Sequence, residues 1–278
     1  MKAFEMIERR ISVRSYTAAL VSDELKLAIE EFCRNIGLGP FGATLRFKLL
    51  SLEPLSKEEL RRLGTYGMIK DARLYLLGAV KEGKGALEDL GYCMEKIILE
   101  ATALGLGTCW LGGTFKRAAF AEKIDLASGE LLPAITPLGY PLKVMPTADR
   151  MIRSGDGSNR RKPWSALFYE ADGKTALTED SAGLYSQVLE AVRLGPSALN
   201  RQPWRLIRDN QGLYHLFLSE NKIYNRIMGK IRIQNIDMGI AMSHFELVAR
   251  DLGLEGMWDV KGRAAPCPGL QYVATWQV

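Results

Sequence analysis

The sequence predicts an α+β fold made of two similar halves, and three observations support this. Helical patterns are separated by short segments of strand character, without a run of β-α-β units. Residues 89–104 are apolar almost all round, as in a helix at the centre of a protein. A second long segment repeats part of this pattern later in the chain. Each half is expected to have a small, mainly antiparallel sheet packed by helices around long central helices.

The repeat joins residues 89–110 to residues 237–258 at a constant offset of 148, without a gap. Nine of these 22 aligned positions are identical, whereas background frequencies give about one or two matches. A two-copy chain suggests a homodimer fused into one polypeptide, with two pseudo-symmetric clefts that can specialise. We expect the halves to be residues 1–172 and 173–278, the second a truncated copy, joined near Asp172-Gly173-Lys174.

In the first half, capping residues and glycines predict the boundaries of the helices. Ser22 and the two acids after it should begin a helix that runs to about Asn35. Ser56-Lys57-Glu58-Glu59 is a capping box for a short helix to about Leu63. The other expected elements are strands at 46–52, 73–80 and 132–140, the long helix at 89–104, and the start of a new element at 108–111.

The second half should replay this order. A helix is expected over residues 179–193, and a hairpin around Asp209-Asn210-Gln211-Gly212 should join strands at 205–207 and 213–218. A long helix at 235–252 and a strand at 270–276 follow. The polar residues 151–162, between the two halves, are expected to form a loop.

Composition excludes several classes of protein. The 278 residues carry a net charge of +5, which is too weak and too spread out to indicate nucleic-acid binding. No apolar run reaches the length of a membrane span, and the amino-terminal residues do not resemble a signal peptide. Four scattered cysteines read as reduced thiols of a cytoplasmic protein, and with only two histidines no metal site is expected.

A basic cluster near the amino terminus could bind phosphate. In an extended chain, Arg10, Ser12 and Arg14 lie on one face, where two guanidinium groups and a hydroxyl make a phosphate cradle. The alternative is a solvated basic terminus. A second basic cluster, Asn159-Arg160-Arg161-Lys162, occurs later in the chain and could equally be a surface loop.

The segment 196–204, Pro-Ser-Ala-Leu-Asn-Arg-Gln-Pro-Trp, offers small residues with amide and hydroxyl groups to a ligand. It could also be only the turn between a helix and a strand. The corresponding segment of the first copy, residues 40–44, has neither Ser nor Asn. Because a shared turn would not require this difference, a ligand-binding role is favoured.

The glycine-rich segment 105–113 is not a dinucleotide fingerprint, because it follows a helix rather than a strand. Gly83-Lys84-Gly85 likewise lacks the frame of a P-loop. Leu111-Gly112-Gly113 could still present backbone N–H groups to a flat ligand. No nucleophile elbow is present, and histidines are few, which suits an enzyme whose cofactor carries the chemistry.

Together and in this order, these segments resemble the flavin-dependent nitroreductase family. The family's Arg-x-Ser-x-Arg/Lys start and Pro-Ser-x-x-Asn-x-Gln-Pro-Trp segment are matched at residues 10–14 and 196–204. Its Gly-Leu-Gly-x-Cys-Trp-(Ile/Leu)-Gly segment, Pro-Leu-Gly-Tyr-Pro strand and Arg-Lys-Pro tail are matched at 105–112, 137–141 and 161–163. The resemblance covers nearly the whole chain and implies the nitroreductase-like fold.

The distribution of the motifs departs from the family pattern. Family members carry all of these segments in one subunit and form homodimers, with FMN at the interface. Here the Pro-Ser segment occurs only in the second half and the other segments belong to the first. The resemblance therefore implies a single-chain branch in which the second half acts as the partner, with one FMN site kept and the chain a monomer.

The resemblance also implies which residues bind FMN. The phosphate and ribityl chain would be held by Arg10, Ser12, Arg14 and Arg161. The ring system would be lined by Pro196, Ser197 and Asn200, and backbone donors at its hydride-accepting edge would come from Leu111 and Gly112. Further candidates are Ile11, Lys162 and the segment Tyr66-Gly67-Met68, which departs from the usual pattern.

The activity that the resemblance implies is reduction of a nitroaromatic, quinone or similar acceptor by NADH or NADPH, through hydride transfer by the flavin. No side chain is expected to act as a catalytic acid or base. The alternative is a non-catalytic protein that binds flavin or another small ligand on the same fold, because a fold alone does not give activity.

Overall fold

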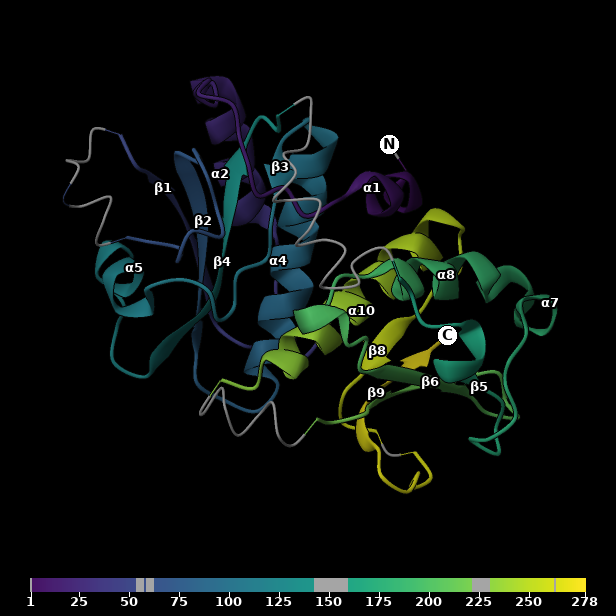
Figure 1. Cartoon of the computed structure of the whole chain (residues 1–278). Coiled ribbons are helices and arrows are strands. Elements are labelled where there is room, and N and C mark those ends of the chain that lie inside the picture. Colours follow the sequence, from purple (N-terminus) through teal and green to yellow (C-terminus); the bar gives the residue numbers. More distant parts are fainter. Residues whose placement is uncertain (1, 54–57, 59–62, 143–159, 222–230, 263) are drawn as a thin grey trace.

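The computed structural model describes residues 2–53, 58, 63–142, 160–221, 231–262 and 264–278. Two long helices, α4 (Ala86–Ala103) and α10 (Ile233–Asp251), cross at the centre, and the two sheets lie on opposite sides of them (Figure 1). The predicted α+β class is confirmed. Most of the predicted capping box and short helix at 56–63, and residues 151–159 of the predicted loop, fall outside the described residues.

The first sheet has the order β1-β2-β4-β3, and all of its pairs are antiparallel. Every residue of β2 except the last is buried, because helices cover both faces of the strand. Leu77 and Ala79 face the cluster around α5 (Arg117–Lys123), while Leu74 and Leu76 face α4. The strands are β1 (Leu45–Ser51), β2 (Leu74–Lys81), β3 (Gly107–Thr108) and β4 (Glu130–Gly139).

The second sheet has the order β5-β6-β7-β9-β8, and only its β5–β6 pair is parallel. The predicted hairpin between β6 and β7 is confirmed, and the Asp209 carboxylate caps its turn by accepting the Gln211 and Leu213 N–H groups. The strands are β5 (Phe168–Tyr169), β6 (Trp204–Arg208), β7 (Tyr214–Leu218), β8 (Met257–Asp259) and β9 (Gln271–Gln277).

The two central helices touch through the glycines of the repeat. A Cβ on Gly91 would overlap the Ile236 carbonyl group, and a Cβ on Gly239 would overlap that of Glu88. Both pairs obey the offset of 148, since 91 + 148 = 239 and 88 + 148 = 236. The contact is therefore the same seen from either helix, as at the two-fold interface of a homodimer. The division into residues 1–172 and 173–278 stays a prediction.

Among the other helices of the described residues, α1 (Ala3–Arg9) and α5 were not expected from the sequence. The predicted helix after Ser22 is confirmed as α2 (Asp23–Asn35), with the Ser22 hydroxyl accepting the Leu25 N–H. The unexpected helices are α1 (Ala3–Arg9), which packs against α10 and α8 (Ser186–Leu194), and α5. Within the described parts of the chain, no helix combines the length and apolarity needed to cross a bilayer.

The single helix predicted over residues 179–193 is wrong. The structure has α7 (Glu179–Ala182), a 3-10 turn η2 (Gly183–Tyr185) and then α8. At Gly183 the chain takes φ 56° and ψ −124°, a conformation that glycine reaches without steric cost. The apolar periodicity continues through this break, so the sequence pattern alone did not reveal it.

Candidate active site

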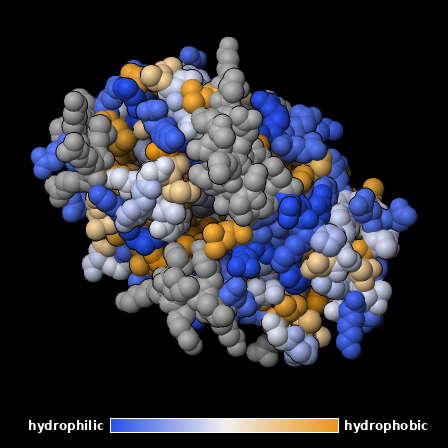
Figure 2. Space-filling view, viewed as in Figure 1, coloured by the Kyte–Doolittle hydropathy of each residue, from blue (hydrophilic) through white to orange (hydrophobic). Residues whose placement is uncertain are grey.

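A cavity of about 270 Å³ lies beside α10 and is lined by residues from both the amino-terminal and the carboxy-terminal parts of the chain. It is lined by all nine residues that the sequence analysis selected: Arg10, Ser12, Arg14, Leu111, Gly112, Arg161, Pro196, Ser197 and Asn200. Ile11 and Met68 also line it, whereas Lys162, Tyr66 and Gly67 are not among its lining residues. On the face seen in Figure 2, hydrophobic surface near the middle adjoins a hydrophilic area on the side of the second sheet.

Arg10 and Arg14 reach the cavity from the extended segment that follows α1. Ser12 pairs with Thr108 in a parallel bridge, and Val13 packs on Gly107, where a Cβ would clash. Because side chains alternate in an extended chain, both arginines point the other way, towards the cavity. The extended conformation predicted for residues 10–14 agrees with this geometry.

The two arginines carry buried positive charge at the cavity wall. Each is only 8% exposed. Among the described residues, Nε and Nη1 of Arg10 have no hydrogen-bond partner, and the nearest carboxylate oxygen is Glu95 Oε1, at 3.8 Å from Nε. Buried donors without acceptors are costly. The arrangement therefore fits an anionic ligand group that would accept these N–H bonds.

Residues 196–200 form the opposite wall, and the backbone of the segment 199–202 is strained. Leu199, Asn200 and Gln202 have positive φ angles of 49°, 51° and 47°. Non-glycine residues in this region cost on the order of 1 kcal/mol each or more, and they concentrate at functional sites. Strain of this kind persists only where surrounding contacts fix the backbone.

Those contacts come from the basic segment at residues 160–162. Gln202 is 2% exposed, and its Oε1 accepts the Lys162 N–H at 2.7 Å. Asn200 Oδ1 accepts from Arg161 Nη1 at 2.8 Å, and its Nδ2 donates to the Arg160 carbonyl at 2.7 Å. The Asn200 amide is thus occupied in positioning Arg161. Gln202 was not selected as a site residue, although it stands in the same sequence motif.

The charge on Lys162 is also affected by this packing. Burial, together with Arg205 and Arg201, lowers the pKa of Lys162 to about 8. Its Nζ donates to the Gln202 carbonyl at 3.3 Å. Lys162 therefore supports the strained segment rather than the cavity wall.

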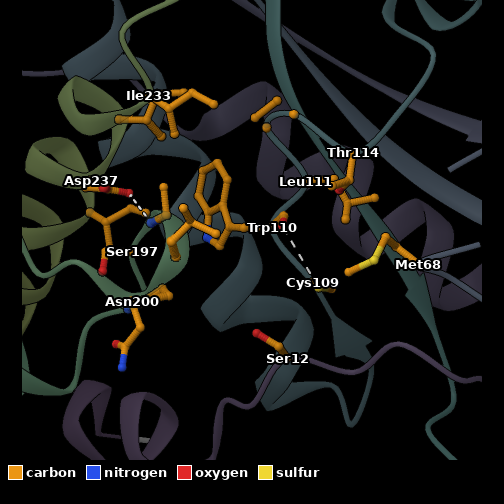
Figure 3. A pocket seen from close by; sticks show the side chains of 18 of the residues that line it. Ser12, Met68, Cys109, Trp110, Leu111, Thr114, Ser197, Asn200, Ile233 and Asp237 are labelled. Carbon is orange, nitrogen blue, oxygen red and sulfur yellow. Dashed lines mark hydrogen bonds between the residues drawn. The ribbon is translucent and has the colours of Figure 1, made fainter. Parts of the chain in front are cut away.

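The glycine-rich wall differs from expectation in one respect. The Leu111 N–H donates to the Ile135 carbonyl at 2.9 Å, so the prediction that it is available to a ligand is wrong. The Leu111 side chain still lines the cavity (Figure 3). The Gly112 carbonyl accepts a hydrogen bond from Arg117 Nη2, which fixes the orientation of this peptide. A backbone donor at Gly112 stays a prediction.

The fourth wall is α10, which the sequence analysis did not assign to the site. Ile233, Ile236, Asp237 and Ile240 line the cavity on successive turns. At the position related by the repeat, Gly85 replaces Ile233, and the Phe41 ring packs directly onto it. Phe41 stands where the second copy has Ser197, so an aromatic ring occupies the pseudo-symmetric position.

Comparison with known proteins agrees with this architecture. A family model described as "Putative TM nitroreductase" matches residues 2–249. The chain belongs to this nitroreductase family. No curated protein matches the nitroreductase-family chain.

Three solved structures are among those similar to this chain. A protein from Thermotoga maritima described as a "putative nitroreductase" has a TM-score of 0.63 and 21% identity, over 99% of this chain and 93% of its own. A nitroreductase family protein from Clostridium difficile 630 gives 0.45 and 20%, over 60% and 96%. A nitroreductase with bound FMN from Desulfitobacterium hafniense gives 0.42 and 18%, over 52% and 93%. The match that spans the whole chain confirms the nitroreductase fold.

Next to Trp110, which lines the cavity, a chain of buried polar groups connects α4, α10 and α8. Glu95 accepts from Trp110 Nε1 at 2.6 Å, and its other oxygen lies 2.9 Å from His244 Nε2. His244 Nδ1 lies 2.9 Å from the Ala191 carbonyl, which can only accept, so this nitrogen carries a proton. Sequence reasoning missed these residues because 149 positions separate Glu95 from His244.

Proposed function

We propose that this protein is an FMN-binding oxidoreductase that uses NADH or NADPH to reduce a nitroaromatic, a quinone or a similar acceptor. The observation that carries the proposal is the pair of buried arginines, Arg10 and Arg14, at a cavity built by both halves of a nitroreductase-family chain. Arg10 has unmatched donors there, among the described residues, and a phosphate group would satisfy them.

Different groups of lining residues suit the phosphate, the ribityl chain and the ring system of FMN. Arg10, Ser12, Arg14 and Arg161 would hold the phosphate and the ribityl chain, since charge-assisted hydrogen bonds to phosphate are the strong ones. Pro196, Ser197 and the three isoleucines of α10 would enclose the ring system. Bound FMN supplies hydride acceptance and donation. The chain's own residues bind, orient and shield it, and no described side chain is required as an acid or base.

The first experiment is to purify the protein and add FMN and a reduced nicotinamide. We expect a yellow protein with flavin absorption, and oxidation of NADH or NADPH that depends on a nitroaromatic or quinone acceptor. Flavin binding without turnover would favour the non-catalytic alternative instead. A colourless protein that does not bind added FMN would contradict the proposal as a whole.

We further expect the chain to be a monomer, because its two halves already form the interface that homodimeric family members build from two subunits. Light scattering after size-exclusion chromatography should give a mass near 31.0 kDa. A mass of twice that value at micromolar concentration would contradict this prediction, but it would not contradict the proposed flavin site. A cytoplasmic location stays a prediction from the cysteines.

A further inference from the structure

The internal repeat provides a reference for one acid in the cavity wall. Asp89 and Asp237 are equivalent positions, and each accepts hydrogen bonds from the loop that follows a Gly-Pro pair. At Asp89 both oxygens are used: Oδ1 accepts the Phe41 N–H at 2.9 Å, and Oδ2 accepts the Ala43 N–H at 2.7 Å. Asp89 thus binds its loop with a complete set of acceptors.

Asp237 binds its loop with one oxygen only. Oδ1 accepts the Ala198 N–H at 3.0 Å, whereas Oδ2 has no hydrogen-bond partner among the described residues. In this loop the N–H groups of Asn200 and Gln202 donate to Ser197 and not to Asp237. The Oδ2 atom of Asp237 therefore receives no hydrogen bond from this loop.

The residue that carries this oxygen lines the candidate flavin site. Asp237 lines the cavity and is 2% exposed, and its neighbours on the same face of α10 are Ile233, Ile236 and Ile240. In Figure 3 the Asp237 side chain points from α10 towards the segment that carries Ser197 and accepts a hydrogen bond from it. A buried polar atom of this kind is normally paired, so its partner is expected to come from the bound ligand.

We propose that Asp237 is a ligand-binding residue whose neutral carboxyl donates its O–H to a hydrogen-bond acceptor, a carbonyl oxygen or ring nitrogen, on the ring system held in the cavity. The inference rests on the proposed function, since it takes that ring system to be the flavin of FMN. A neutral carboxylic acid can donate where a carboxylate cannot.

The surroundings of Asp237 keep it neutral. Burial raises the pKa of Asp237 to about 8, and only the Ala198 N–H works in the opposite direction. The charged groups that line the same cavity are Arg10, Arg14 and Arg161, across from α10. From α4, the Glu88 side chain is directed to Asn235, and Tyr92 contacts Lys96. Above pH 8 the carboxyl loses its proton, and its negative oxygens repel a ring acceptor.

The test compares FMN affinity between pH 7 and pH 9 in the wild type and in Asp237→Asn, using the quenching of FMN fluorescence. The asparagine keeps an acceptor for Ala198 and an N–H donor in place of the O–H, but it does not titrate. The wild type should bind roughly tenfold more weakly at pH 9 than at pH 7. The variant should show no such loss between pH 7 and pH 9.

Titration of FMN itself is common to both proteins and cancels in the comparison. Parallel pH profiles for the two proteins would overturn the role of Asp237 while leaving the flavin site intact. Failure of the wild type to bind FMN at any pH would instead overturn the proposed function, and this inference with it. The two failures are therefore distinguishable.

Unfolding of the ligand-free protein gives a second readout. When a carboxyl has a higher pKa in the folded than in the unfolded state, the free energy of unfolding of the protein falls as the pH rises towards the folded-state pKa. The melting temperature of Asp237→Asn minus that of the wild type should therefore increase from pH 5 to pH 8. The matched variant Asp89→Asn should melt lower at every pH, because it places an amide against two N–H donors. A constant gap between Asp237→Asn and wild type would contradict a neutral Asp237.

Discussion

Replacing Gly239 by alanine should strongly destabilise the fold. In an isolated helix this change is favourable by about 1 kcal/mol. Here the added methyl group would overlap the Glu88 carbonyl of α4, and no side-chain rotation can relieve a clash between two backbones. Because tight cores tolerate even small additions poorly, we expect a net loss on the order of 3 kcal/mol or more. The melting temperature should fall by roughly 6–12 °C, or the protein should aggregate on expression.

Two further variants make this result interpretable. Gly91→Ala should be as damaging as Gly239→Ala, since its Cβ would overlap the Ile236 carbonyl at the equivalent place in the contact. Gly83→Ala is the matched control, because a Cβ there meets nothing within 4 Å. Normal stability of Gly239→Ala, measured by thermal unfolding, would show that the close approach of α4 and α10 is not required for folding.

The contact between α4 and α10 explains why both copies of the repeat have a glycine at this position, Gly91 in the first and Gly239 in the second. Ridges of small residues allow helix axes to approach closely, and the approach carries the cavity wall of α10 towards the residues of the first half. An isologous contact needs the small residue twice, once from each side. These two glycines, identical in the two copies, therefore form the contact between α4 and α10. The residues that line the cavity include several that differ between the copies, such as Ile233 and Ser197.

The sequence predicted elements whose boundaries depend on local chemistry. The helix α2 was found because Ser22 caps it, and the β6–β7 hairpin because Asp209 can close its turn. The helices α1 and α5 were missed because seven residues carry too few turns for a periodic signal. The break at Gly183 was missed because a glycine inside an apolar pattern is often tolerated in a helix.

The candidate site likewise has residues that the sequence predicted and residues that it did not. Polar motifs led to Arg10, Ser197 and the other members of the set that line the cavity. The apolar wall of α10 gave no such signal, because isoleucines facing a ligand have the same spacing as isoleucines facing a core. Asp237 was visible only as an identity within the repeat. Its difference from Asp89 depends on the strained turn at Leu199, which no sequence pattern described.

Removing the Arg14 side chain should weaken FMN binding by about 1.5–3 kcal/mol, the range for a hydrogen bond to a charged group. This corresponds to a rise in Kd of roughly 10- to 150-fold. The physical reason is burial: a guanidinium that is 8% exposed interacts with a phosphate with little screening by water. Isothermal titration with FMN would measure the change in Arg14→Ala directly.

Two comparisons separate a phosphate contact from general damage. Arg34→Ala, on the exposed face of α2, changes the net charge equally and should leave the Kd for FMN unchanged. Riboflavin lacks the phosphate, so the wild type should prefer FMN to riboflavin, and Arg14→Ala should lose most of this preference. If Arg14→Ala weakened both ligands equally, Arg14 would support the shape of the cavity without contacting the phosphate. Unchanged affinity for both would show that the buried arginines serve the fold alone.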